Sequence, residues 1–235
     1  ERAISLDPCY AQAHGLHAVC LAWRTFQGWE NRDTAFAEAA ERADQAVACD
    51  PGEPWAYLAH GFIALANRRD SEAVAALSRA IDASPNFAYA HGLLGCAHAL
   101  GGRPDQAIEC IDRGVRLSPR DIFGEEYELY YATAHFQAGR YIEAASAAQR
   151  AIQQRPGHAN LYMFAAASYG LAGEIDAAAH IAHVGDLAHA PELLGMARDG
   201  RVQGKAIVYP QRRSKAILDV ARWSADDEAR YLAGG

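Results

Sequence analysis

The chain has 235 residues, of which 51% are apolar and 22% are charged, so it is expected to fold around a hydrophobic core as one or two domains. Its net charge of −7 argues against nucleic-acid binding, because phosphate affinity comes from clustered Lys and Arg, and the densest basic spot holds only Arg212, Arg213 and Lys215. No segment approaches the ~18 apolar residues of a membrane-spanning helix, and no signal peptide precedes the first helix. A soluble, cytoplasmic protein is therefore predicted.

The first residues are typical of the end of a helix, and the sequence begins on Glu1 without a methionine. We therefore expect an excised piece of a longer protein. Five cysteines follow along the chain, Cys9, Cys20, Cys49, Cys96 and Cys110, an odd number without a CxxC pair. This usage predicts reduced, buried thiols of a cytosolic protein and no disulfide framework.

Prolines mark a regular period along most of the chain, since Pro51, Pro85 and Pro119 are each 34 residues apart. Small residues recur in phase with them, and two further copies lead to Pro156 and Pro191. The recurring small residues are Ala39 and Ala46, then Gly61, Ala73 and Ala80, then Gly95, Ala107 and Gly114, then Gly139, Ala144 and Ala151, then Gly173, Ala178 and Gly185. In pairs of helices, Gly and Ala allow close backbone approach, while Leu77, Leu94 and Ile111 fill the remaining space.

Each proline is expected to end the second helix of a pair, because it lacks a backbone donor and restricts the residue before it. The segments 101–105 and 138–140 contain glycines and predict the turn within a pair. This code closely resembles the tetratricopeptide repeat family over about residues 1–191. The resemblance implies an all-α, right-handed superhelical solenoid of about five helical hairpins, and we expect residues 192–235 to form a helical C-terminal cap.

Two departures from the period predict insertions. Pro8 and Pro51 are 43 residues apart, and the surplus falls in 25–33, between the two helices of the first hairpin. Pro119 and Pro156 are 37 apart, with the extra residues near 122–126. The first insertion carries Phe26 and Trp29, which either tuck onto the neighbouring helix, the reading we favour, or anchor a partner.

The resemblance implies that the first helices of the hairpins line a concave groove that binds a partner. Because the inward positions are mostly apolar and aromatic, they suit a peptide or protein ligand better than a charged tail. For Leu58, Phe62 and Leu129, core and groove roles both remain open. The predicted groove residues are Trp23, Trp55, Leu58, Phe62, Tyr89, Cys96, Glu126, Leu129, Thr133, Phe136, Asn160 and Met163.

A carboxylate clamp, which related domains use to hold chaperone tails, is not expected. It needs Lys, Asn and Arg at inward positions, and the corresponding places here hold Leu58, Phe62, Gly92 and Cys96. The acidic group of Glu125, Glu126 and Glu128 is interpreted as an exposed, charged start of a helix.

No enzyme activity and no cofactor are predicted, because the GxSxG, HExxH and GxxxxGK[ST] motifs do not occur. The histidine pairs His14/His17 and His180/His183 share helix faces, but no Cys, Asp or Glu completes a metal-ligand set near them. His17, His60, His98 and His135 recur where the repeat packs its helices, so a packing role is preferred.

The sequence thus predicts a scaffold that binds a protein or peptide of unknown identity. Only 2 of its 22 basic residues are Lys, a bias common in bacteria with GC-rich genomes, and the chain resembles the C-terminal repeat region of bacterial multidomain signalling proteins. A regulatory module is therefore expected. Self-association into a homo-oligomer is the main alternative, and a small-molecule sensor is the next.

Overall fold

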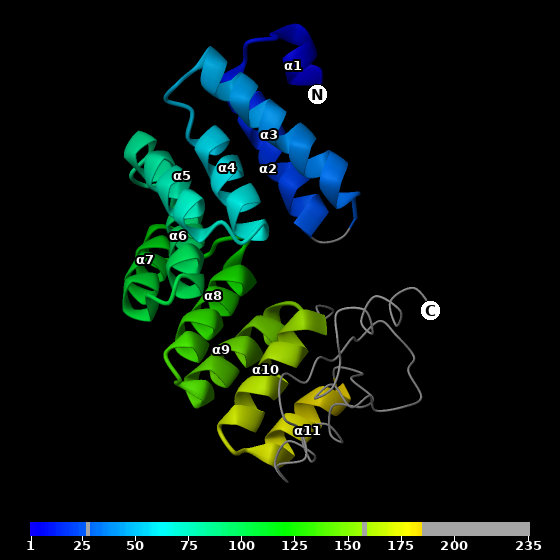
Figure 1. Cartoon of the computed structure of the whole chain (residues 1–235), viewed down its shortest axis with the longest axis vertical. Helices are drawn as coiled ribbons and strands as arrows, with labels where there is room; N and C mark the ends of the chain where they lie inside the picture. The colour runs from blue at the N-terminus through cyan, green and yellow to red at the C-terminus, as the bar shows by residue number, and fades with distance from the viewer. Residues whose placement is uncertain (27–28, 157–158, 185–235) are drawn as a thin grey trace. The chain divides into compact units, whose positions relative to one another are not determined.

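Helices account for the regular structure of the part described by the computed structural model, residues 1–26, 29–156 and 159–184, which contains no strand (Figure 1). The chain divides into two compact units, Glu1–Ala138 and Gly139–Gly235. Unit 1 contains α1 (Arg2–Leu6), α2 (Ala11–Phe26), α3 (Arg32–Cys49), α4 (Pro54–Ala66), α5 (Asp70–Ala83), α6 (Ala88–Leu100), α7 (Pro104–Leu117) and α8 (Gly124–Gln137). Unit 2 contains α9 (Tyr141–Gln154), α10 (Ala159–Leu171) and α11 (Ile175–Val184).

After the short α1, the described helices follow one another in sequence as five pairs, which we call hairpins: α2–α3, α4–α5, α6–α7, α8–α9 and α10–α11. The two helices pack together in α2–α3, α4–α5 and α6–α7 of unit 1 and in α10–α11 of unit 2. The predicted all-α repeat of about five hairpins is confirmed. As expected, the second helices stop just before the periodic prolines, since they end at Cys49, Ala83, Leu117 and Gln154, two residues ahead of Pro51, Pro85, Pro119 and Pro156. The linker before α8, residues 118–123, is longer than the linkers 50–53 and 84–87, which locates part of the second predicted insertion.

Three-residue turns join the helices of the last four hairpins, and the middle residue of each has a positive φ. Glycine fills this position at Gly102 (72°), Gly139 (74°) and Gly173 (86°), whereas Arg68 (58°) fills it after α4. In the α6–α7 turn, the amide of Arg103 donates to the carbonyl of His98 (2.9 Å), a Schellman closure that satisfies the end of α6.

Glycines also lie where the two helices of a hairpin pack closely, as the small-residue code predicts. A Cβ on Gly61 would lie 2.5 Å from Cγ of Leu77, and a Cβ on Gly95 would lie 2.5 Å from Cγ1 of Ile111. Leu77 and Ile111 are fully buried. The recurring small residues therefore mark direct contacts between the two helices of a hairpin. At each contact, a larger residue on one helix fills the space left by glycine on the other.

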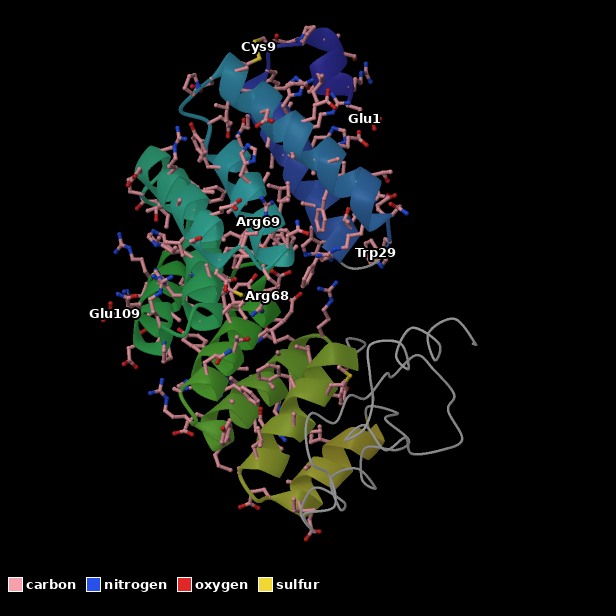
Figure 2. The ribbon with its side chains drawn as sticks, in the orientation of Figure 1. Glu1, Cys9, Trp29, Arg68, Arg69 and Glu109 are labelled. Atoms are coloured by element: carbon pink, nitrogen blue, oxygen red, sulfur yellow. A yellow bond between two sulfur atoms is a disulfide. The ribbon has the colours of Figure 1, made fainter. Side chains whose placement is uncertain are left out.

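The prediction of reduced, buried thiols is wrong for Cys9 and Cys49, which are bonded to each other, and for Cys20, which is exposed. Cys9 and Cys49 form a disulfide with their Cα atoms 5.4 Å apart, while Cys20, Cys96 and Cys110 are free. Cys9 lies just before α2 and Cys49 ends α3, so the bond joins the two ends of the first hairpin, at the end of that hairpin away from Trp29 (Figure 2). The antiparallel arrangement brings these residues together, which removes the cysteine argument for a cytoplasmic location.

The predicted repeat boundary at 191 and the expected cap, residues 192–235, lie outside the described residues. Among the helices that are described, none combines the length and the apolar character needed to cross a membrane.

Candidate functional site

The first helices of the hairpins in unit 1 form a curved row. α2 packs against α4, and α6 packs against both α4 and α8. Neighbouring helix axes lie about 8–10 Å apart, so a flat row would separate α2 from α8 by roughly 24–30 Å. Yet Nε1 of Trp23 on α2 donates to Oε1 of Glu126 on α8 at 2.9 Å. The row must therefore curve, and we call its inner side the concave face.

Glu126 is the centre of a hydrogen-bonded group on this face. Besides the bond from Trp23, its Oε2 accepts hydrogen bonds from the hydroxyls of Tyr89 on α6 and Tyr130 on α8, both at 2.7 Å. These four residues are called the Glu126 cluster. They join the first, third and fourth hairpins, and all three donors are uncharged.

The electrostatics of the cluster follow from burial beside a carboxylate. Tyr89 and Tyr130 are buried, and burial followed by the Glu126 charge raises the pKa of each hydroxyl well above its ordinary value. Burial and then Glu126 also raise the pKa of the Cys96 thiol to about 12, which keeps it protonated at neutral pH. Tyr89 and Tyr130 therefore keep their hydroxyl protons at neutral pH, and they can donate them to the Glu126 carboxylate.

Two aromatic rings flank the start of the predicted insertion: Phe26, the last residue of α2, and Trp29, between α2 and α3. The ring centroids of Phe26 and Phe62 lie 5.7 Å apart, and those of Trp29 and Trp23 lie 5.4 Å apart, both edge to face. Phe26 and Trp29 remain 55% and 63% exposed. Each ring thus tucks against a helix, as favoured from the sequence, and still presents more than half of its surface to solvent.

A segment of unit 1 matches a known repeat: residues 88–121 fit the family model of the tetratricopeptide repeat, and these residues span α6, its turn and α7. This segment is therefore similar to a single tetratricopeptide repeat. No curated protein matches its sequence.

Solved structures share the fold of this chain at low sequence identity. PilW, a type IV pilus biogenesis factor, is 17% identical with a TM-score of 0.65, covering 80% of this chain and 86% of PilW. YrrB, described as having an unusual peptide-binding site, is 19% identical with a TM-score of 0.54, covering 85% and 96%. A repeat protein from Parabacteroides merdae is 13% identical with a TM-score of 0.58, covering 84% and 77%.

Several residues predicted to line the groove are buried in the core of unit 1. Leu58 is fully buried, Phe62 is 6% exposed and Tyr89 is 5% exposed. The choice left open for Leu58 and Phe62 is therefore decided in favour of the core. Trp55 keeps part of its surface exposed while its ring packs on Phe87, with centroids 4.7 Å apart.

The remaining predicted groove residues are spread along α8 and α10. Leu129, Thr133 and Phe136 are partly exposed on α8, where the Thr133 hydroxyl donates to the carbonyl of Leu129 (2.9 Å). Met163 is partly exposed in unit 2, and the side chain of Asn160 lies outside the described part. The structure thus gathers Trp23, Tyr89 and Glu126 directly and places Cys96 within their electrostatic reach, while partner contact by any of the predicted residues stays a prediction.

Glu126 also corrects the interpretation of the acidic group at the start of α8. It was expected to be exposed to solvent, but it is partly buried and accepts three hydrogen bonds. Sequence reasoning missed Tyr130, which lies four residues after Glu126 and so on the same helix face. It also missed Arg68, whose charge acts on the Cys96 thiol from the end of α4.

The histidines of the described residues are distributed through the hairpins. No group of three or more His, Cys, Asp or Glu side chains comes together there in a way that would hold a metal ion. His14 contacts the carbonyl of Pro8 through Nε2 (3.0 Å), and His60 contacts Asp44 through Nε2 (3.2 Å). Burial lowers the pKa of His17 and of His98. The side chains of His180 and His183 lie outside the described part.

Proposed function

We propose that this chain is a scaffold that holds a protein or peptide against the concave face of unit 1. The observation that carries the proposal is the Trp23–Glu126 hydrogen bond on the concave face, with the more than half exposed ring of Trp29 packed on Trp23. Aromatic side chains at the centre of a concave surface are the typical anchors of protein interfaces. The peptide-binding site described for YrrB belongs to that protein, and it supports this use of the fold.

A regulatory role within a larger bacterial signalling protein is the finer part of the proposal, and it rests on the sequence resemblance. No enzyme activity is part of it. A cytoplasmic location is not part of it either, because the Cys9–Cys49 disulfide is typical of oxidising compartments.

Selection of peptides from a displayed random library by the full chain tests the proposal. Selected peptides should bind the wild type, and Leu129→Asp and Phe136→Asp on α8 should each weaken binding at least tenfold, since a buried charge at an apolar contact is costly. Phe62→Asp would be a poor choice, because Phe62 is part of the core and the change would damage folding.

Ile142→Asp provides the matched control. Ile142 is an apolar residue of α9 that is 46% exposed and is not a predicted groove residue, so this variant should bind peptides like the wild type. Far-UV circular dichroism must show unchanged helicity in all three variants. Failure to select any peptide would contradict the proposal, and equal binding by every variant would move the site away from α8. Light scattering over a concentration series would reveal self-association as the competing use of the surface.

A further inference from the structure

We propose that the ligand of the concave face presents an Arg or Lys side chain to the carboxylate of Glu126. This inference deepens the proposed function and rests on it. The hydrogen bonds that Glu126 accepts and the charges around it carry the inference, together with the Trp23 ring at the carboxylate and the Trp29 ring packed on Trp23.

The carboxylate has unused accepting capacity. Oε2 accepts two hydrogen bonds, from Tyr89 and Tyr130, whereas Oε1 accepts one, from Trp23. An ionised carboxylate offers about four lone-pair sites, so Oε1 can accept one more donor. Glu126 is partly exposed, and a donor can therefore approach it from the solvent side.

The negative charge of Glu126 is not neutralised within the described part of the chain. The three donors to it are neutral, and no ion pair among the described residues includes Glu126. This partly buried carboxylate is stabilised by these hydrogen bonds and by its place in the first turn of α8, without a paired cation. A cationic partner would therefore add a charge-assisted bond at the cost of little further desolvation.

The local field also favours a cation. The positive charge of Arg68 lowers the pKa of the Cys96 thiol. Glu126 raises that pKa by more than Arg68 lowers it, and Asp70 also raises it. Arg68 therefore offsets the effect of Glu126 at Cys96 only in part. A carboxylate whose charge is offset only in part complements a basic residue better than an acidic one.

The neighbouring tryptophan rings suit the rest of such a side chain. Trp23 donates to Oε1, and Trp29, which packs on Trp23, keeps 63% of its surface exposed. Aromatic faces attract ammonium and guanidinium groups and pack well against their alkyl stems. A basic residue flanked by apolar residues would thus contact the Glu126 carboxylate and the neighbouring tryptophan rings at the same time.

The displayed library provides the test with the full chain near neutral pH. Peptides selected by the wild type should be enriched in Arg or Lys at one position and depleted in Asp and Glu there. Synthetic versions with norleucine at that position should bind about tenfold or more weakly. Glu126→Gln, which keeps the shape but removes the charge, should abolish the preference for the basic peptide over the norleucine peptide.

Glu109→Gln is the matched control, because Glu109 is exposed on α7 and lies on the opposite side of unit 1 from Trp29 in Figure 2. This variant loses the same charge and should keep the preference. Selected peptides without a basic position, or a preference that survives in a folded Glu126→Gln, would overturn this inference and leave the scaffold proposal standing. A wild-type chain that selects no peptide would overturn both, and the wild-type selection decides even if Glu126→Gln fails to fold.

Discussion

Arg68 occupies a backbone conformation that glycine adopts at the same place in three other hairpins. Its φ is 58°, against 72° for Gly102 and similar values for Gly139 and Gly173. A side chain in this left-handed region costs about 1 kcal/mol, because Cβ approaches the backbone carbonyl. Arg68→Gly should therefore raise the free energy of unfolding by at most roughly 0.5 kcal/mol, because the conformational entropy of glycine in the unfolded chain offsets much of the gain. Urea denaturation followed by circular dichroism measures it.

The equivalent turn of the next hairpin supplies a reciprocal change. A Cβ on Gly102 would meet no atom within 4 Å, so Gly102→Ala tests the backbone conformation alone and should lower the free energy of unfolding by about 1 kcal/mol. Arg68→Ala keeps the strained φ and should leave stability close to that of the wild type. If Arg68→Ala stabilised the protein as much as Arg68→Gly, the cause would be the arginine side chain and not the backbone.

The Glu126 cluster shows where residue-level prediction from the sequence ends. Trp23, Tyr89 and Glu126 were each predicted to face the groove from the repeat register. Their mutual hydrogen bonds depend on how strongly the row of first helices curves, and many small packing contacts set that curvature. The nearness of Tyr130 to Glu126 was the one contact that spacing in the sequence could predict, because a residue four positions after Glu126 shares its helix face.

At the scale of the element, the first hairpin is closed by the Cys9–Cys49 disulfide, whose cysteines are 40 residues apart in sequence. A cross-link of this span restricts the unfolded chain and should stabilise the hairpin by roughly 2–4 kcal/mol. Reduction is therefore expected to lower the melting temperature of the protein. Thermal unfolding with and without a reducing agent measures the effect.

Two serine variants separate the disulfide from other effects of reduction. The double change Cys9→Ser with Cys49→Ser should have a lower melting temperature that no longer responds to the reducing agent. Cys20→Ser alters an exposed free cysteine and should behave as the wild type. A double variant that melts like the oxidised wild type would show that the disulfide contributes no stability.

The ends of the helices were predictable because local chemistry sets them. Each periodic second helix ends two residues before a proline, and glycine adopts the left-handed conformation in the turns of three hairpins. The disulfide was missed for a different reason. Cys9 and Cys49 lie far apart in sequence and come together only because the helices of a hairpin run antiparallel. Their pairing can therefore be predicted only once the positions of these helices are known.

At the scale of the whole molecule, the 34-residue period predicted the number and order of the hairpins, since each hairpin packs mainly on its sequence neighbours. The period contains no information on the Trp23–Glu126 bond, which connects the first hairpin to the fourth. It also does not predict that several tyrosines with raised pKa values lie in unit 1. Tyr89, Tyr127, Tyr130 and Tyr131, on α6 and α8, all have raised pKa values, with burial as the largest cause.

These tyrosines predict that unit 1 is sensitive to alkali. A raised pKa in the folded state means that folding favours the neutral hydroxyl. The resulting stability is complete below the unfolded pKa of about 10 and is lost as the pH rises above it. Lysine titration adds little in the same range, because the chain has only two Lys, Lys205 and Lys215. The melting temperature should therefore fall progressively above about pH 10.

Thermal unfolding at a series of pH values, with tyrosinate absorbance recorded in parallel, checks this prediction. Tyr130→Phe removes one buried hydroxyl and should make the alkaline loss of stability less steep, although it lowers stability at neutral pH by breaking a hydrogen bond to Glu126. Tyr10→Phe alters a tyrosine that is 44% exposed and should leave the slope unchanged. If the two variants showed the same slope, ionisation of the tyrosines in the Glu126 cluster would not be the cause of alkaline unfolding.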